Sequence, residues 1–268
     1  MVKKIILIFA LCFVANADLL EDKIKNFIGE TKYNESKNLI SYLFSSTQKY
    51  YKNDDINSIA VLETLKDGGL IELFSKDPQD IELIFTTKYH PVIFMRVISE
   101  SLNSMGYTYV LTKKISKSTE GFMWHVVVAS KNIPSPILLN TFLNSKGCEI
   151  ENVEKDGNIW RYSINSEFAK IDSLDIKVGE NEQLKKPLVA YMVSAKDASS
   201  ITIRSHNADF WYPRVTFLDG NLKLIEKVDM DERRYAVKLS IPKNSVYIKI
   251  EDKYTLENIK RGLNVLLN

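Results

Sequence analysis

Residues 209–217, which read DFWYPRVTF, hold the side chains of this chain that are best suited to stacking on a ligand. Phe210 and Tyr212 offer flat aromatic faces, Arg214 offers a planar cation, and His206 lies just upstream. Aromatic rings beside arginine can stack on a glycan, and the same residue types dominate the centres of protein interfaces. These four residues are our candidate contacts for a partner protein or a glycan.

Strand alternation divides this stretch into two faces. One parity is apolar and should face a core: Trp211, Val215 and Phe217. Phe210 and Tyr212 fall on the other parity, where one or both would be exposed. Pro213 restricts the segment to an edge strand or a strand start. We therefore predict that Trp211 is a buried anchor, and packing is favoured over ligand stacking for the stretch as a whole.

Calcium binding and catalysis by a cysteine thiol each need a group of side chains that this sequence supplies only in part. The run His206-Asn207-Ala208-Asp209 offers oxygen donors for calcium, but without a second ligand cluster it is typical of a loop with Asx turns. Cys148 would need a histidine partner to act as a nucleophile, and none of the three histidines has a motif around it. We interpret Cys148 as a small buried apolar residue and His125 as a partly buried structural residue.

The short motifs of well-known enzyme classes are missing from the sequence. It contains no GxSxG, P-loop, HExxH, CxxC or dinucleotide fingerprint. We therefore expect a protein that is not an enzyme and that carries no cofactor and no metal.

The first 17 residues, MVKKIILIFALCFVANA, indicate the compartment. Two lysines precede an apolar run, and the small residues ANA follow it, which is the pattern of a cleaved signal peptide. The run has about ten residues, whereas a membrane-spanning helix needs roughly twenty. Leu11 before Cys12 argues against a lipoprotein, which needs a small residue there. We expect cleavage after Ala17, a periplasmic mature chain from Asp18, and no membrane span in it.

The charge balance argues against nucleic acid as a partner. The chain has 36 basic and 34 acidic residues. Two lysines leave with the expected signal peptide, which contains no acid, so the mature chain carries 34 residues of each sign. A balanced chain has no net electrostatic reason to bind nucleic acid or an anionic membrane surface.

Residues 18–78 show the spacing of helices. The apolar residues of SIAVLETL recur at helical spacing, so a helix is expected there. Asp54 or Asp55 is a plausible N-cap for this helix, and Gly68-Gly69 should end it. We assign residues 18–78 to a helical N-terminal region.

Residues 79–166 alternate between strand and helix patterns. The expected strands are 81–85, 107–115, 122–130, 148–154 and 159–164, with helices starting at His90-Pro91 and Ser135-Pro136. The turn Asp156-Gly157-Asn158 joins the last two strands as a hairpin. The order is βαββαβ with one added strand, which predicts a ferredoxin-like domain with an antiparallel sheet and two helices on one face.

The last third of the chain shows only short strand patterns. Residues 167–187 are charged around the GENEQ sequence of residues 179–183, and we expect a linker there. Residues 188–268 contain short apolar runs separated by turns, which is typical of an all-β sandwich. The fold class expected for the whole chain is α+β.

Two resemblances support an envelope protein. The element order of residues 80–165 resembles ferredoxin-like modules of bacterial envelope proteins, including SPOR-type peptidoglycan-binding domains and periplasmic domains of pilus and secretion assembly platforms. The segments DDINSIAVLETLKDGGL and YTLENIKRGL are similar in texture to uncharacterised periplasmic proteins of Campylobacter-type bacteria, some of which accompany flagellar motor disks. These resemblances imply an accessory role and transfer no active residue to this chain.

Together, these patterns predict a non-enzymatic periplasmic structural or interaction protein. It would act as a scaffold or accessory component of an envelope assembly such as the flagellar motor, with other periplasmic or envelope proteins as partners. The alternative is a peptidoglycan- or carbohydrate-binding periplasmic module that uses the ferredoxin-like sheet or the sandwich.

Overall fold

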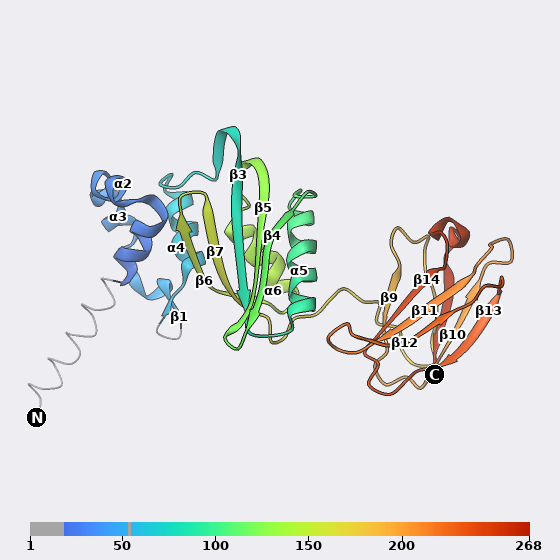
Figure 1. Ribbon diagram of the computed structural model, residues 1–268. Helices are drawn as coiled ribbons and strands as arrows, with labels where there is room; N and C mark the ends of the chain where they lie inside the picture. The colour runs from blue at the N-terminus through green and yellow to red at the C-terminus, as the bar shows by residue number, and fades with distance from the viewer. Residues whose placement is uncertain (1–18, 53–54) are drawn as a thin grey trace, which may run out of the picture. The chain divides into compact units, whose positions relative to one another are not determined.

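The computed structural model describes residues 19–52 and 55–268 (Figure 1). The expected signal peptide and Asp54 lie outside the described residues. The chain divides into two compact units, Met1–Lys170 and Ile171–Asn268, here called the N-terminal and C-terminal units. The expected α+β class is confirmed, because helices and strands both build the structure. No helix in residues 19–52 or 55–268 is long and apolar enough to cross a membrane.

The first part of the N-terminal unit is mainly helical. Residues 19–28 are helical and are followed by α2 Glu30–Glu35, α3 Lys37–Leu43, the 3-10 turn η1 Thr47–Tyr50, the short strands β1 Tyr51–Lys52 and β2 Asp55–Ile56, and α4 Ser58–Asp67. The N-cap of α4 is Asn57, whose side chain accepts a hydrogen bond from the N–H of Ala60 at 3.1 Å. This corrects the expected cap, because Asp55 pairs with Lys52 in a small hairpin instead.

A five-stranded sheet with two further helices forms the rest of this unit. Its strands are β3 Phe74–Thr87, β4 Leu111–Ser118, β5 Gly121–Asn132, β6 Glu149–Asp156 and β7 Ile159–Asn165, and its helices are α5 Pro91–Ser104 and α6 Pro136–Ser145. Proline occupies the first position of both helices, and Ser135 caps α6 as expected. The strands lie in the order β4-β5-β3-β7-β6.

The direction of β7 differs from the expected antiparallel sheet. β7 runs parallel to β3, with Glu82 opposite Ile159, while the other neighbouring strands are antiparallel. The hairpin turn before β7 is where the sequence predicts it, but β7 is its inner strand and β6 its outer strand. Trp160, Tyr162 and Ile164 of β7 are all buried, so the more apolar strand takes the interior position.

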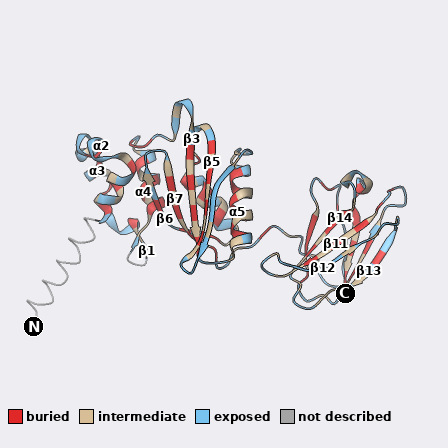
Figure 2. Cartoon of the chain, viewed as in Figure 1, coloured by how far each residue is buried: buried red, intermediate tan, exposed pale blue. Residues whose placement is uncertain are grey.

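The two faces of this sheet have different environments. Helix α6 packs against α4, α5 and β6, and it lies behind the strands in the view of Figure 1. Along β3, the residues Ile81, Leu83 and Phe85 are buried and alternate with half-buried residues. Figure 2 shows the same alternation along β3, β5 and β7. One face is therefore the core face, and we call the other the open face.

The C-terminal unit consists of two four-stranded sheets around one core. Its elements are β8 Asn181–Gln183, β9 Tyr191–Ser194, β10 Ser200–Ser205, β11 Pro213–Leu218, β12 Leu224–Asp229, β13 Ala236–Ser240, β14 Tyr247–Asp252, the 3-10 turn η2 Leu256–Ile259 and β15 Leu263–Leu267. The sheets have the orders β13-β10-β15-β8 and β12-β11-β14-β9, and all their neighbouring strands are antiparallel. Buried residues of both sheets form one hydrophobic cluster.

Much of the expected linker, residues 167–187, is folded in this unit. The boundary between the units falls after Lys170, and Ile171 and Leu184 are buried. Strand β8 lies inside the segment and pairs with β15, with Glu182 opposite Val265. All three residues of β8 are exposed because the strand is at a sheet edge. The polarity that resembles a linker in the sequence is therefore that of an edge strand.

Candidate functional site

Trp211 anchors the segment that carries the candidate residues. Its side chain is fully buried in the core of the C-terminal unit, and its Nε1 donates a hydrogen bond to the carbonyl oxygen of Glu251 at 3.2 Å. Val215 and Phe217, which share its parity, are fully buried as well. The expectation that Trp211 is a core residue is confirmed. Strand β11 begins two residues later at Pro213, so the neighbours of Trp211 are presented just outside the strand.

Phe210 belongs to a stack of three side chains. The guanidinium carbon of Arg233 lies 4.2 Å from the centre of the Phe210 ring and 4.6 Å from the centre of the Tyr235 ring. Phe210 and Tyr235 remain 56% and 50% exposed. A cation over the faces of two aromatic rings is attracted by both. We call Phe210, Arg233 and Tyr235 the Arg233 stack.

The guanidinium of Arg233 is held in place by backbone rather than by carboxylates. Its Nη2 donates to the carbonyl oxygens of Asn207 at 2.9 Å and Asp209 at 2.6 Å. Its Nε is buried and has no hydrogen-bond partner in the part of the chain that the structure describes, and no acidic side chain there forms an ion pair with it. The stack therefore presents an ordered positive charge that no carboxylate in direct contact neutralises.

Side chains of the loop before Phe210 hold that loop in place. The Asp209 side chain is buried, its Oδ1 pairs with Nη1 of Arg261 at 2.6 Å, and its Oδ2 accepts from the N–H of Arg261 at 3.4 Å. His206 is exposed, and its Nδ1 accepts a hydrogen bond from the N–H of Ala208 at 3.1 Å. Among the described residues, no group of three His, Cys, Asp or Glu side chains could hold a metal ion. Asp209 thus holds the loop through Arg261.

Tyr212, which is half-buried, packs against the exposed Tyr254. The rings of Tyr212 and Tyr254 meet edge to face, with centres 5.1 Å apart. Buried Asp252 accepts hydrogen bonds from the N–H groups of Tyr212 at 2.7 Å and Tyr254 at 2.8 Å, so one carboxylate positions both residues. Tyr254 is 62% exposed. We call Tyr212 and Tyr254 the tyrosine pair.

Arg214 forms an ion pair within its own sheet. It lies opposite Asp229 on β12, and its Nε donates to the Oδ1 of Asp229 at 2.7 Å. Lys227 contacts the other oxygen of the same carboxylate at 2.7 Å. The hydrogen bonds from Lys227 and Arg214 hold the pKa of Asp229 below its ordinary value. Arg214 is therefore less available to a partner than Arg233.

No protein-family model, curated protein or solved structure matches the chain. The arrangement of side chains must therefore indicate the function. Of the candidates named from the sequence, Phe210 and Tyr212 lie in aromatic clusters, Arg214 is tied to β12 and His206 to its own loop. Sequence reasoning missed Arg233, Tyr235 and Tyr254. Residues 233–235 read RRY, and nothing in that pattern indicates contact with Phe210.

The open face of the N-terminal sheet carries a polar cluster. Glu82 accepts from Lys113 at 2.7 Å and its other oxygen lies 2.7 Å from the Nε2 of His125. The hydrogen bond from Lys113, with a smaller contribution from His125, holds the pKa of Glu82 below its ordinary value. His125 is half-buried on the strand that the sequence predicts for it.

Cys148 is buried as expected, and this burial raises the pKa of its thiol to about 11.

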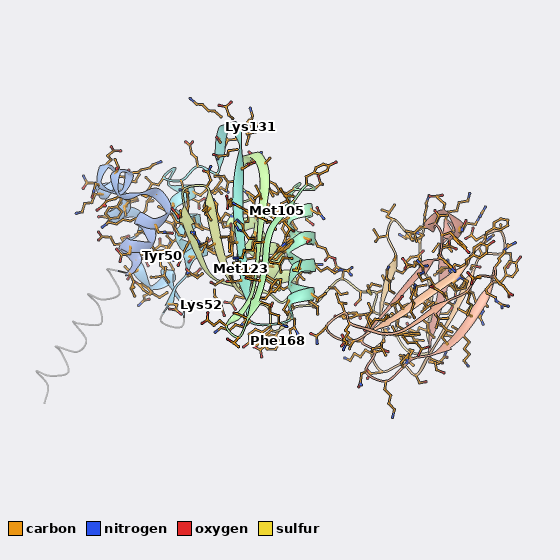
Figure 3. The ribbon with its side chains drawn as sticks, in the orientation of Figure 1. Tyr50, Lys52, Met105, Met123, Lys131 and Phe168 are labelled. Carbon is orange, nitrogen blue, oxygen red and sulfur yellow. The ribbon has the colours of Figure 1, made fainter. Side chains whose placement is uncertain are left out.

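A groove of about 530 Å³ lies at one end of this open face. Four residues in a row across the sheet line it, each paired with the next: Ser116, Met123, Thr86 and Ser163. Met123 is labelled on β5 in Figure 3. Hydroxyl groups and one flexible apolar side chain therefore form its floor.

Proposed function

We propose that this chain is a non-enzymatic periplasmic interaction protein, a scaffold or accessory component of an envelope assembly such as the flagellar motor. The observation that carries the proposal is the position of Arg233 between the exposed rings of Phe210 and Tyr235. Arginine, tyrosine and other aromatic residues are enriched where interfaces derive most of their binding energy. Export rests on the signal-peptide pattern of the first 17 residues.

The order of the Arg233 stack favours binding. Two backbone carbonyls already hold the guanidinium, so a partner that covers it orders little additional side chain. About half of the surface of Phe210 and of Tyr235 is still in water and can be buried by a partner. A partner with a carboxylate could also pair with a cation that no acid of the described chain contacts directly.

The domain architecture supports a scaffold role. We propose that the sheet of the N-terminal unit is a ferredoxin-like module with β7 inserted between β3 and β6, and that the C-terminal unit is a β-sandwich. The supporting observations are the strand order and the single core between two antiparallel sheets. Each unit has its own core, so each can hold a separate binding surface.

Site-specific photo-crosslinking in the intact envelope tests this function. A benzophenone amino acid at Phe210 should give a crosslinked species of defined mass, and the same probe at Phe74 should not. Phe74 is the matched position because it is also phenylalanine and also 56% exposed, but it belongs to β3 of the N-terminal unit. Adding Arg233→Gln should lower the yield at position 210. Equal yields at the two positions, or a cytoplasmic location of the protein, would refute the proposal.

Peptidoglycan or carbohydrate binding is the second candidate function. The groove on the open face favours it, because the hydroxyl groups of Thr86, Ser116 and Ser163 suit a glycan. Retention of the mature protein on purified sacculi tests this candidate. The double variant Thr86→Val and Ser163→Ala should reduce retention at an unchanged melting temperature. Retention that depends on Phe210 instead would move the glycan site to the Arg233 stack.

A further inference from the structure

The two edge strands of the five-stranded sheet, β6 and β4, differ in whether other parts of the chain bond to their outer side. At the β6 edge, side chains from the helical region bond to the backbone of the strand. Asn26 accepts from the N–H of Lys155 at 3.0 Å and donates to its carbonyl at 3.1 Å. Ser58 accepts from the N–H of Val153 at 3.2 Å, and Lys23 donates to the Val153 carbonyl at 3.2 Å. This edge is therefore capped by the chain itself.

The β4 edge is open in the described part of the chain. β5 is the neighbour of β4 in the sheet, and no strand there pairs with its other side. Seven of the eight β4 residues are exposed, and only Ser116 is half-buried. The strand beside β5 is accordingly drawn almost wholly as exposed in Figure 2. An open strand edge presents unpaired N–H and C=O groups that can bind another strand.

The side chains of this edge combine apolar groups with positive charge. Leu111 is 70% and Ile115 is 50% exposed, although both are large apolar residues. Lys113, Lys114 and Lys117 lie on the same strand, and β4 contains no acidic residue. Lys113 pairs with Glu82 of β3, two strands away, whereas Lys114 and Lys117 make no ion pair with any residue in 19–52 or 55–268.

These charges exclude some occupants. A second copy of β4 would bring its lysines against those of the first, and like charges facing each other destabilise strand pairing. The bulge between Thr112 and Lys114 limits regular pairing further. The exposed edge strand β12 of the C-terminal unit differs, because it carries both signs and its Asp229 is already paired with Arg214 and Lys227. An acidic strand therefore complements β4.

We propose that β4 binds an extended segment of a partner protein that contains acidic and apolar residues and adds to the sheet as an antiparallel strand. Ile115 and Lys117 lie opposite Trp124 and Phe122, whose side chains are on the core face, and Lys114 lies opposite His125 on the open face. The added strand would place an apolar residue against Ile115 and acidic residues against Lys114 and Lys117. Read along the partner, the order is acidic, any, apolar, acidic.

This interaction goes beyond the proposed function because it uses another surface, on the other unit. The Arg233 stack takes no part in it, so crosslinking at Phe210 and binding at β4 can succeed or fail independently. Strand addition derives affinity from backbone hydrogen bonds and specificity from side chains on alternate faces.

The test uses the mature full chain and the acetylated, amidated peptide TETVET. Residue-resolved amide hydrogen exchange should show slower exchange for the β4 amides that do not bond to β5. At peptide concentrations ten times Kd, these amides should slow about tenfold, because only the free state exchanges. The lysine analogue TKTVKT and a TETVET peptide N-methylated on alternate amides should give no protection. Protection by TKTVKT equal to that by TETVET would overturn the proposal.

Charge reversal supplies the matched variants. Lys114→Glu with Lys117→Glu should abolish protection by TETVET and create protection by TKTVKT. Lys66→Glu with Lys131→Glu changes the net charge equally but lies on α4 and near the end of β5, where Figure 3 labels Lys131, and should change nothing. Loss of protection in both double variants would show that only net charge matters and would refute the site. Concentration-dependent protection of β4 without peptide would mean self-pairing and would also refute it.

Discussion

The Oδ2 atom of Asp252 accepts a hydrogen bond from the backbone N–H of Tyr212 at 2.7 Å. Its Oδ1 atom accepts from the N–H groups of Tyr254 at 2.8 Å and Thr255 at 3.0 Å. Asp252 is buried at the end of β14, and it fixes the backbone on both sides of the tyrosine pair. One carboxylate therefore joins the segment before β11 to the loop after β14.

Replacing Asp252 by alanine should destabilise the protein by about 3 kcal/mol, because three part-buried backbone N–H groups lose their acceptor, each at the low end of the roughly 1–3 kcal/mol that an unpaired buried group costs. The control is Asp231→Ala, since Asp231 is an exposed acid that pairs with Lys253 at the surface. That change should cost less than about 1 kcal/mol. Urea unfolding measures both values, and equal effects would show that Asp252 does not hold the two segments.

Replacing Trp211 by alanine should cost about 3–5 kcal/mol, the range for truncating a large aromatic residue in a core. Tyr212→Ala should cost far less, because Tyr212 lies on the half-buried parity of the same segment. Chemical unfolding of the two variants measures the difference. If Trp211→Ala left stability unchanged and removed partner capture, the indole would be a contact residue despite its burial.

The stability of the protein should depend on Cys148 at high pH. Its thiol has a pKa raised to about 11 by burial, against an ordinary value of 9.0. Because the folded pKa lies above the unfolded one, its contribution is complete below pH 9 and is lost as the pH rises toward 11. The loss should reach about 2–3 kcal/mol.

Comparison with Cys148→Ala isolates this contribution from other groups that titrate in the same range. Urea unfolding at pH 8 and pH 10.5 should show a steeper fall in stability for the unchanged protein than for the variant. Identical pH dependence of the two proteins would contradict the raised pKa. The native thiol should also react slowly with iodoacetamide at pH 8, and unfolding should restore its normal rate.

The C-terminal unit should fold without the N-terminal one. Residues 171–268 contain both four-stranded sheets and the whole hydrophobic cluster between them. A fragment with these residues should give a β-type circular dichroism spectrum and a cooperative unfolding transition. A fragment that begins at residue 188 should be less stable, since it lacks β8 and the buried Leu184. A helical or disordered spectrum for residues 171–268 would contradict this arrangement.

Local signals in the sequence were sufficient to predict several features of the fold. Ser135 and the following proline predict the start of α6, because a hydroxyl cap and a fixed φ act within one turn of helix. Asp156-Gly157-Asn158 predicts the β6–β7 hairpin for a similar local reason. The alternation around Trp211 predicts which side chains are buried, because a strand with one face on a core must follow period two.

Other features depended on contacts between distant segments. The parallel pairing of β7 with β3 was missed, because Glu82 and Ile159 are far apart in the sequence and the hairpin signal at residues 156–158 does not specify which of its two strands joins β3. The polar residues 181–183 were interpreted as linker, because an exposed edge strand and a linker have the same composition. Asn57 rather than Asp55 caps α4, since the small β1–β2 hairpin includes Asp55.

The aromatic residues show the same division. Alternation was enough to indicate that Phe210 and Tyr212 are less buried than Trp211, because the alternation of burial continues through residues 209–212 ahead of β11. Only the tertiary structure brings Arg233 and Tyr235 to Phe210, and Tyr254 to Tyr212. Those contacts form where the loops that flank β11, β13 and β14 meet, and the relative placement of loops depends on how the strands pair. Strand pairing is a long-range property of the fold, which no single segment encodes.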